Sequence, residues 1–295
     1  MATGIDHVVI AVRDLDQAIA DYTAAGFTVT PGGEHVSGQT HNALVAFLDG
    51  SYFELIAWKD PDTPQDNEWW RRMSLGEGFV DYALRVADLD AEVERLRAEG
   101  LDVPDPVAGG RTRPDGERAE WQTLRLDPAT YPALPFYCHS TNDRALRVPS
   151  GEAAAHENGA TGIEAIFVGV TDLEQAAADY AKVAGIAGTD RPSSVEVENE
   201  WRSFQVGAVT VTLVKPTDPA SELAQTIASR GNVPIEVALQ GQASHVGPVD
   251  PALTHGAKLA IVPVASVHAD PAEEGNRPVY EKDPADIDEH NLPPI

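Results

Sequence analysis

The chain has 295 residues, and its 47 acidic against 21 basic side chains give a formal net charge of −26 at pH 7. Such a charge repels phosphate backbones and anionic lipids, so nucleic-acid and membrane partners are not expected. No apolar run approaches the roughly 20 residues that cross a bilayer. Cys138 is the only cysteine, which excludes an internal disulfide and fits a cytoplasmic protein.

A strand-then-helix pattern occurs three times along the chain. Each copy contains an Asp-Leu-Asp or Asp-Leu-Glu motif, which starts at Asp14, Asp88 and Asp172. The offsets from the first copy are 88 minus 14, or 74, and 172 minus 14, or 158. Because one such unit cannot bury its apolar face alone, the copies must pack on each other. We therefore expect a functional site between units.

The first unit is predicted to have the order β-α-β-β-β. Residues 5–12 are almost wholly apolar and β-branched, as in a strand buried on both faces. Asp14 is expected to cap a helix that ends at Gly26. Strands are predicted at 27–29, 43–48 and 52–57, with Asp49-Gly50 as a hairpin turn, and Gly32-Gly33 is interpreted as a turn.

The second unit keeps the first strand, predicted at 79–86, the helix at 89–99 and later strands at 121–126 and 135–139. The third has strands at 163–170, 201–206 and 209–214, and a shorter fourth unit spans 233–239 and 258–264 without a convincing helix. We predict an α+β fold of tandem βαβββ modules that form cupped mixed β-sheets with flanking helices. The expected divisions are a first domain at 1–141, a linker at 142–160, a second, degenerate domain at 161–269 and an acidic, Pro-rich tail at 270–295.

Tandem units with a histidine in the first strand and a glutamate in the last resemble the vicinal-oxygen-chelate superfamily. That superfamily contains glyoxalase I, extradiol dioxygenases, epimerases and bleomycin-resistance proteins, and its glyoxalase-like subgroup is the most similar. The resemblance covers roughly the first half of the chain. It is carried by Asp-His-Val-Val-Ile-Ala-Val at 6–12, Pro-Gly-Gly-Glu-His at 31–35, Thr-His-Asn-Ala-Leu at 40–44, Asp-Gly-Ser-Tyr-Phe-Glu-Leu-Ile-Ala at 49–57 and Leu-Pro-Phe-Tyr at 134–137.

The resemblance implies a pocket between two modules and a divalent metal held by first-strand and last-strand residues. Carried over by position, His7, Glu54 and His139 would hold iron, zinc, manganese or nickel, with Tyr137 in place of His139 if the alignment slips. Asp81 takes the first-strand position of the second module and would ligate, orient His7 or act as general base. The structural alternative is a hydrogen-bonded core histidine and no metal.

Other polar and aromatic side chains are candidates for substrate contacts. His41 is a candidate catalytic group, and Asn42, Arg85, Trp121 and Tyr137 are candidates for substrate binding. Asn42 could instead cap a turn, and Arg85 could instead pair with Asp81 or Glu54. Trp69 and Trp70 are expected on a helix that packs on the core or on a second subunit. Cys138 is expected to be a small buried hydrophobe, and four histidines are expected at the surface: His245, His255, His268 and His290.

The leading hypothesis is a metal-assisted lyase, isomerase or dioxygenase that acts on a small molecule in an N-terminal pocket. In the third unit Ala165 replaces His7, and Val211 or Thr212 takes the place of Glu54, so the second half has no matching ligand set. The alternative is a metal-free ligand-binding protein of the bleomycin-resistance type that attracts a cationic compound. A homodimer with the second half as its scaffold is a further expectation.

Overall fold

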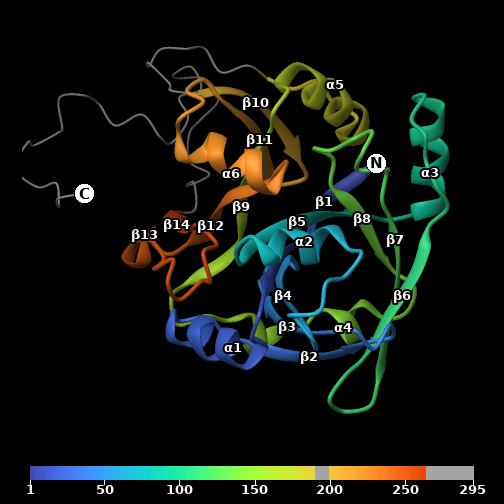
Figure 1. The fold of residues 1–295 in the computed structure, drawn as a ribbon. Coiled ribbons are helices and arrows are strands. Elements are labelled where there is room, and N and C mark those ends of the chain that lie inside the picture. The colour runs from blue at the N-terminus through green and yellow to red at the C-terminus, as the bar shows by residue number, and fades with distance from the viewer. Residues whose placement is uncertain (190–198, 264–295) are drawn as a thin grey trace, which may run out of the picture.

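The computed structural model describes residues 1–189 and 199–263 (Figure 1). The predicted tail at 270–295, His268 and His290 lie outside the described residues, as does the end of the strand predicted at 258–264. Within the described ranges, no helix is both long and apolar enough to cross a membrane.

The first βαβββ unit forms, and its helix begins as predicted. Asp14 accepts a hydrogen bond from the backbone N–H of Gln17 at 3.0 Å. The strand predicted at 27–29 is wrong, because the second strand starts at Thr30 and includes the Gly32-Gly33 pair. The elements are β1 (Ala2–Val12), α1 (Leu15–Ala24), β2 (Thr30–His35), β3 (Thr40–Ala46) and β4 (Tyr52–Trp58).

Two glycines in β2 allow its neighbours to approach closely. A Cβ on Gly32 would lie 2.0 Å from the side-chain oxygen of Asn42, and one on Gly33 would lie 1.9 Å from the carbonyl oxygen of Thr112. Gly33 also has a φ of +120°, a conformation that other residues rarely adopt. The glycine pair therefore allows β2 to pack closely against β3 and against the second unit.

The second unit repeats the order of the first. Trp69 and Trp70 lie on the predicted helix and pack against a buried cluster. The strand between the helix and residues 121–126 was not predicted, because its Gly109-Gly110 pair is atypical of strands. The elements are α2 (Glu68–Ser74), β5 (Gly78–Val86), α3 (Leu89–Ala98), β6 (Val107–Thr112), β7 (Arg118–Leu124) and β8 (Phe136–Ser140).

The two units close into a barrel with the strand order β1-β4-β3-β2-β6-β7-β8-β5. At one seam β1 pairs with β5, and at the other β2 pairs with β6, both antiparallel. Each seam thus joins equivalent strands of the two copies. This arrangement confirms the expectation that the copies pack on each other.

The segment 142–160, predicted as a linker, packs against the first unit. It contains α4 (Arg144–Arg147) and the 3-10 helix η1 (Gly151–Ala154). The backbone N–H of Thr28 donates to Nδ1 of His156 at 2.9 Å, and Nε2 of the same ring lies 3.0 Å from the carbonyl oxygen of Ala46. The segment is therefore part of the packing around the barrel.

The second half forms a separate six-stranded sheet of order β10-β11-β9-β12-β14-β13. Figure 1 shows it beside the barrel, with β5 near the junction. As expected, no α-helix lies between β12 and β14, whose connection is fully described. The predicted α+β class with βαβββ modules is confirmed. The elements are β9 (Ala160–Gly169), α5 (Leu173–Ala184), β10 (Asn199–Val206), β11 (Val209–Pro216), α6 (Glu222–Arg230), β12 (Val233–Gly241), the 3-10 helix η2 (Ala243–His245), β13 (Gly247–Pro248) and β14 (Leu259–Pro263).

His255 joins the two halves and is not the surface residue that we predicted. Its side chain is only 9% exposed. Nδ1 lies 3.0 Å from Oε2 of Glu77, and Nε2 lies 3.1 Å from Oδ2 of Asp21. One ring from the second half therefore bridges two carboxylates of the first. His245, in contrast, is exposed as expected.

We expect His255→Asn to lower the free energy of unfolding by about 1–3 kcal/mol, because Glu77 and Asp21 lose their shared partner. His255 has a φ of +54°, which asparagine tolerates, so backbone strain does not contribute. Urea denaturation measures the change, with the exposed variant His245→Asn as control. Equal unfolding midpoints for both variants and the wild type would contradict this role.

Candidate active site

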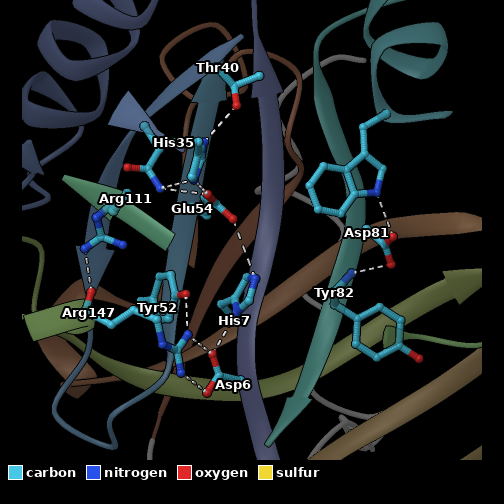
Figure 2. Close-up of polar contacts among 12 residues, drawn as sticks. Asp6, His7, His35, Thr40, Tyr52, Glu54, Asp81, Tyr82, Arg111 and Arg147 are labelled. Atoms are coloured by element: carbon cyan, nitrogen blue, oxygen red, sulfur yellow. Dashed lines mark hydrogen bonds and ion pairs between the residues drawn. The ribbon is translucent and has the colours of Figure 1, made fainter. Parts of the chain in front are cut away.

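A β-bulge in β1 brings two neighbouring side chains together. In the pairing of β1 with β5, Ile5 lies opposite Leu84 and His7 lies opposite Ala83, so Asp6 is the extra residue. Bulges re-aim side chains that would otherwise alternate between the faces of a sheet. Oδ1 of Asp6 consequently lies 2.8 Å from Nδ1 of His7 (Figure 2).

The Asp6 carboxylate is fully buried and pairs with two arginines of the segment 142–160. Arg147 donates to its two oxygens at 2.6 and 2.9 Å, and Arg144 donates to Oδ2. Burial alone would raise the pKa of Asp6, but the charge and hydrogen bonds of Arg147, together with His7, hold this pKa well below its usual value. An ionised carboxylate only accepts hydrogen bonds, so Nδ1 of His7 carries the proton.

The His7 ring is held by aromatic neighbours with Nε2 toward the barrel interior. It stacks on Tyr52 with ring centroids 4.7 Å apart and meets Phe136 edge-on at 5.4 Å. Nε2 lies 3.6 Å from Oε2 of Glu54 on β4. The structure thus brings together His7 and Glu54, two of the predicted site residues.

Glu54 lies between two imidazoles. Asn42 donates to Oε1 at 2.7 Å, and Nε2 of His35 lies 3.4 Å from the same oxygen. Burial by itself would raise the pKa of Glu54, but His35, His7 and Asn42 outweigh this effect and lower the pKa to about 2. Glu54 is therefore a carboxylate at neutral pH. Because so acidic a group accepts protons weakly, the imidazoles are the better proton-transfer groups.

His35 ends β2 on the other side of Glu54. Its Nδ1 lies 2.8 Å from the hydroxyl oxygen of Thr40, and its ring meets Trp121 edge-on at 6.0 Å. The two histidines therefore flank one carboxylate, and each is positioned through its other ring nitrogen.

These groups line a cavity of about 660 Å³ inside the barrel. The charged and imidazole side chains of its lining are His7, His35, Glu54, Asp66, Arg111 and Arg147. A cavity that combines apolar walls with convergent polar groups is typical of small-molecule sites. The apolar lining includes Tyr52, Ile56, Trp58, Trp69, Trp121 and Phe136.

Asp81 does not line the cavity. Its carboxylate accepts a hydrogen bond from Nε1 of Trp69 at 2.7 Å and one from the backbone N–H of Tyr82 at 2.8 Å, and it pairs with Arg125. Figure 2 shows it on β5, apart from His7. The structure therefore does not bring Asp81 to His7. Asp81 instead binds Trp69, which lines the cavity.

The residues of β8 that line the cavity are not those that we predicted. Phe136 and Cys138 line the cavity. On the opposite face, Tyr137 donates to Glu92 at 3.1 Å, and Nδ1 of His139 lies 3.2 Å from a backbone carbonyl. The structure thus places neither Tyr137 nor His139 at the site.

Strand pairing explains this placement. Val9 pairs with Glu54, and Ala83 pairs with Phe136. Since 83 minus 9 is 74, the repeat offset, Phe136 is the counterpart of Glu54 in the second unit. The offset between these last-strand positions is 136 minus 54, or 82, because the second unit has longer connections.

The other predicted contacts fall into two groups. Trp121 lines the cavity, whereas His41, Asn42 and Arg85 do not. Burial lowers the pKa of His41, which lies on β3. Asn42 acts through its hydrogen bond to Glu54 and does not cap a turn. Arg85 forms no ion pair with Asp81 or Glu54 and lies close to the backbone of β1 at its N-terminal end.

A metal site can be tested against the groups present. The ligand atoms of Asp6, His7 and Cys138 lie within 4.8 Å of one another, close enough to hold a metal ion. However, two guanidinium groups already pair with Asp6, and burial raises the pKa of the Cys138 thiol to about 12. An ion at this position would have to displace the arginines from Asp6 and the proton from Cys138. The predicted set of His7, Glu54 and His139 is not assembled.

The second half has lost this arrangement, as its sequence indicated. Ala165 stands at the position of His7, since 165 minus 7 is 158. Pairing of β9 with β11 aligns Thr212 with Glu54. The first half therefore contains the candidate site.

Four site residues were missed by the sequence analysis: Asp6, His35, Arg111 and Arg147. Asp6 and His35 fall within motifs that carry the family resemblance, so a signal was present. Arg111 lies in the unpredicted strand β6, and Arg147 lies in the expected linker. Their proximity depends on long-range packing and leaves no local pattern.

Comparison with known proteins supports the predicted family. The profile of a family described as "Glyoxalase-like domain" matches residues 5–184, which run from β1 to α5. No curated protein matches the chain.

Three solved structures are similar in fold. A hypothetical protein from Staphylococcus aureus has a TM-score of 0.67 at 14% identity, over 88% of this chain and 99% of that chain. A triple mutant of 4-hydroxymandelate synthase from Streptomyces coelicolor has a TM-score of 0.54 at 15% identity, over 84% and 77%. A xylose isomerase-like TIM barrel/4-hydroxyphenylpyruvate dioxygenase fusion protein has a TM-score of 0.50 at 14% identity, over 81% and 36%. At these identities the likeness shows the fold alone.

The low pKa of Glu54 predicts acid sensitivity. A carboxyl whose pKa falls from its ordinary 4.5 to about 2 stabilises the fold above pH 4.5 and loses this contribution as the pH falls toward 2. We expect the melting temperature of Glu54→Gln to fall less than that of the wild type over this window. Calorimetry between neutral pH and this acid range measures it, with the exposed Glu152→Gln as control. Parallel curves for Glu54→Gln and the wild type would disprove the assignment.

Proposed function

The chain belongs to the glyoxalase-like domain family, and we propose that its barrel cavity is the active site of a small-molecule enzyme that moves protons through His7. The observation that carries this proposal is the position of one imidazole between two carboxylates. Asp6 binds Nδ1 at 2.8 Å, and Glu54 lies 3.6 Å from Nε2.

This arrangement suits a general base. With Nδ1 protonated toward Asp6, Nε2 presents its lone pair to the cavity and can accept a proton from a bound substrate. The imidazolium that forms then lies between two ionised carboxylates, which stabilise its charge. Aromatic side chains around the cavity reduce competition from water.

His35 extends this chemistry to a second position. It lies on the other side of Glu54, so a proton removed at His7 can be matched by one delivered at His35. Two acid–base groups around one substrate suit an isomerase or a lyase.

Proton abstraction from carbon can be detected without knowledge of the natural substrate. We expect the protein in D₂O to exchange C–H protons of one class among 2-oxo acids, 2-hydroxy ketones and 3-oxo acids, followed by proton NMR. His7→Gln should slow this exchange by about 10²- to 10⁴-fold, because it removes the base. His245→Gln and chelator dialysis should leave the rate unchanged.

A different result would favour a binding protein. If no class exchanges while a compound of these classes binds saturably in the cavity, the enzyme proposal fails. Equal exchange rates for the wild type and His7→Gln would also contradict it.

A further inference from the structure

Arg111 is a buried cation without a carboxylate partner. It is 3% exposed and lines the cavity near Glu54 and Arg147. Among the described residues, no Asp or Glu oxygen lies within 4.0 Å of its guanidinium nitrogens. An unpaired buried charge is costly, so the structure retains a group that an anion would stabilise.

The guanidinium is fixed but keeps donors free. It has five N–H groups in a planar fork. Nε donates to the carbonyl oxygen of Gly32 at 2.9 Å, and Nη2 donates to the carbonyl oxygen of Arg147 at 2.7 Å (Figure 2). Nη1 has no hydrogen-bond partner among the described residues and keeps accessible surface. The Nη1–Nη2 edge can therefore donate to a ligand.

The charged groups of the cavity lining are not all free to meet a ligand. Arg147 is already paired with Asp6, whereas Arg111 has no such partner and lies in the same lining as Glu54 and Asp66. A monoanion balances the charge of Arg111, whereas a dianion would also meet the ionised Glu54.

We propose that Arg111 binds the carboxylate of a small, flat monocarboxylic acid. This inference rests on the proposed function and names its substrate class. A planar carboxylate matches the free edge of the guanidinium in a bidentate pair. The apolar body of the acid lies against Trp58, Trp69 and Trp121, and its reacting atoms face His7.

Three probes of nearly one shape test this assignment: benzoate, benzamide and benzamidine. Their charges are negative, neutral and positive, so charge alone separates them. Quenching of intrinsic tryptophan fluorescence, checked by ligand-observed NMR, gives their Kd values. We expect benzoate to bind about tenfold or more tightly than benzamide, because charge-assisted hydrogen bonds form only with benzoate. Equal affinities, or tightest binding of benzamidine, would overturn the proposal.

Variants locate the effect. Arg111→Gln should weaken benzoate binding by about tenfold or more and leave benzamide binding unchanged, while the exposed Arg118→Gln should change neither. If Arg111→Gln does not fold, the wild-type comparison of benzoate with benzamide still decides. Phenyl phosphate that binds more tightly than benzoate would overturn the carboxylate assignment.

Failure of this inference can be told from failure of the proposed function. His7→Gln should keep benzoate binding while it loses proton exchange. Arg111-dependent benzoate binding without any proton exchange would support the carboxylate site and contradict the enzyme proposal. Proton exchange without Arg111-dependent benzoate binding would support the enzyme proposal and contradict the carboxylate site.

Discussion

The ion pair between Arg147 and Asp6 is the interaction on which the site depends. It joins residues 141 apart in the chain and buries both partners. Arg147 keeps Asp6 ionised, and Asp6 in turn orients His7. The carbonyl oxygen of Arg147 also accepts a hydrogen bond from Arg111. Loss of one partner would leave the other charge buried and unpaired, which typically costs about 3–5 kcal/mol.

Duplication builds the cavity, and divergence between the copies gives it two different sides. The first copy contributes His7 from its first strand and Glu54 from its last strand. In the second copy these positions hold Asp81, which pairs with Arg125 and Trp69, and Phe136, which lies against His7. One copy thus supplies the acid–base groups, and the other supplies much of the aromatic wall.

The periodic parts of this fold could be predicted from the sequence, because capped helices and β-branched strands recur at fixed offsets. The strands β2 and β6 could not, since each contains a Gly-Gly pair that usually indicates a turn. In the site, His7 and Glu54 were predicted from the resemblance to the vicinal-oxygen-chelate superfamily. His139 was misplaced because the repeat offset does not hold through the longer connections before β8. Arg147 could not be predicted, because its role arises only when the segment 142–160 packs back onto β1.

The protonation state of His7 tests the account most directly. Long-range proton–nitrogen NMR of the histidine rings, assigned with His7→Gln, reports which nitrogen carries the proton in the neutral ring. We expect Nδ1 to be protonated and Nε2 not, because ionised Asp6 accepts a hydrogen bond from Nδ1. A neutral ring with the proton on Nε2 would contradict it.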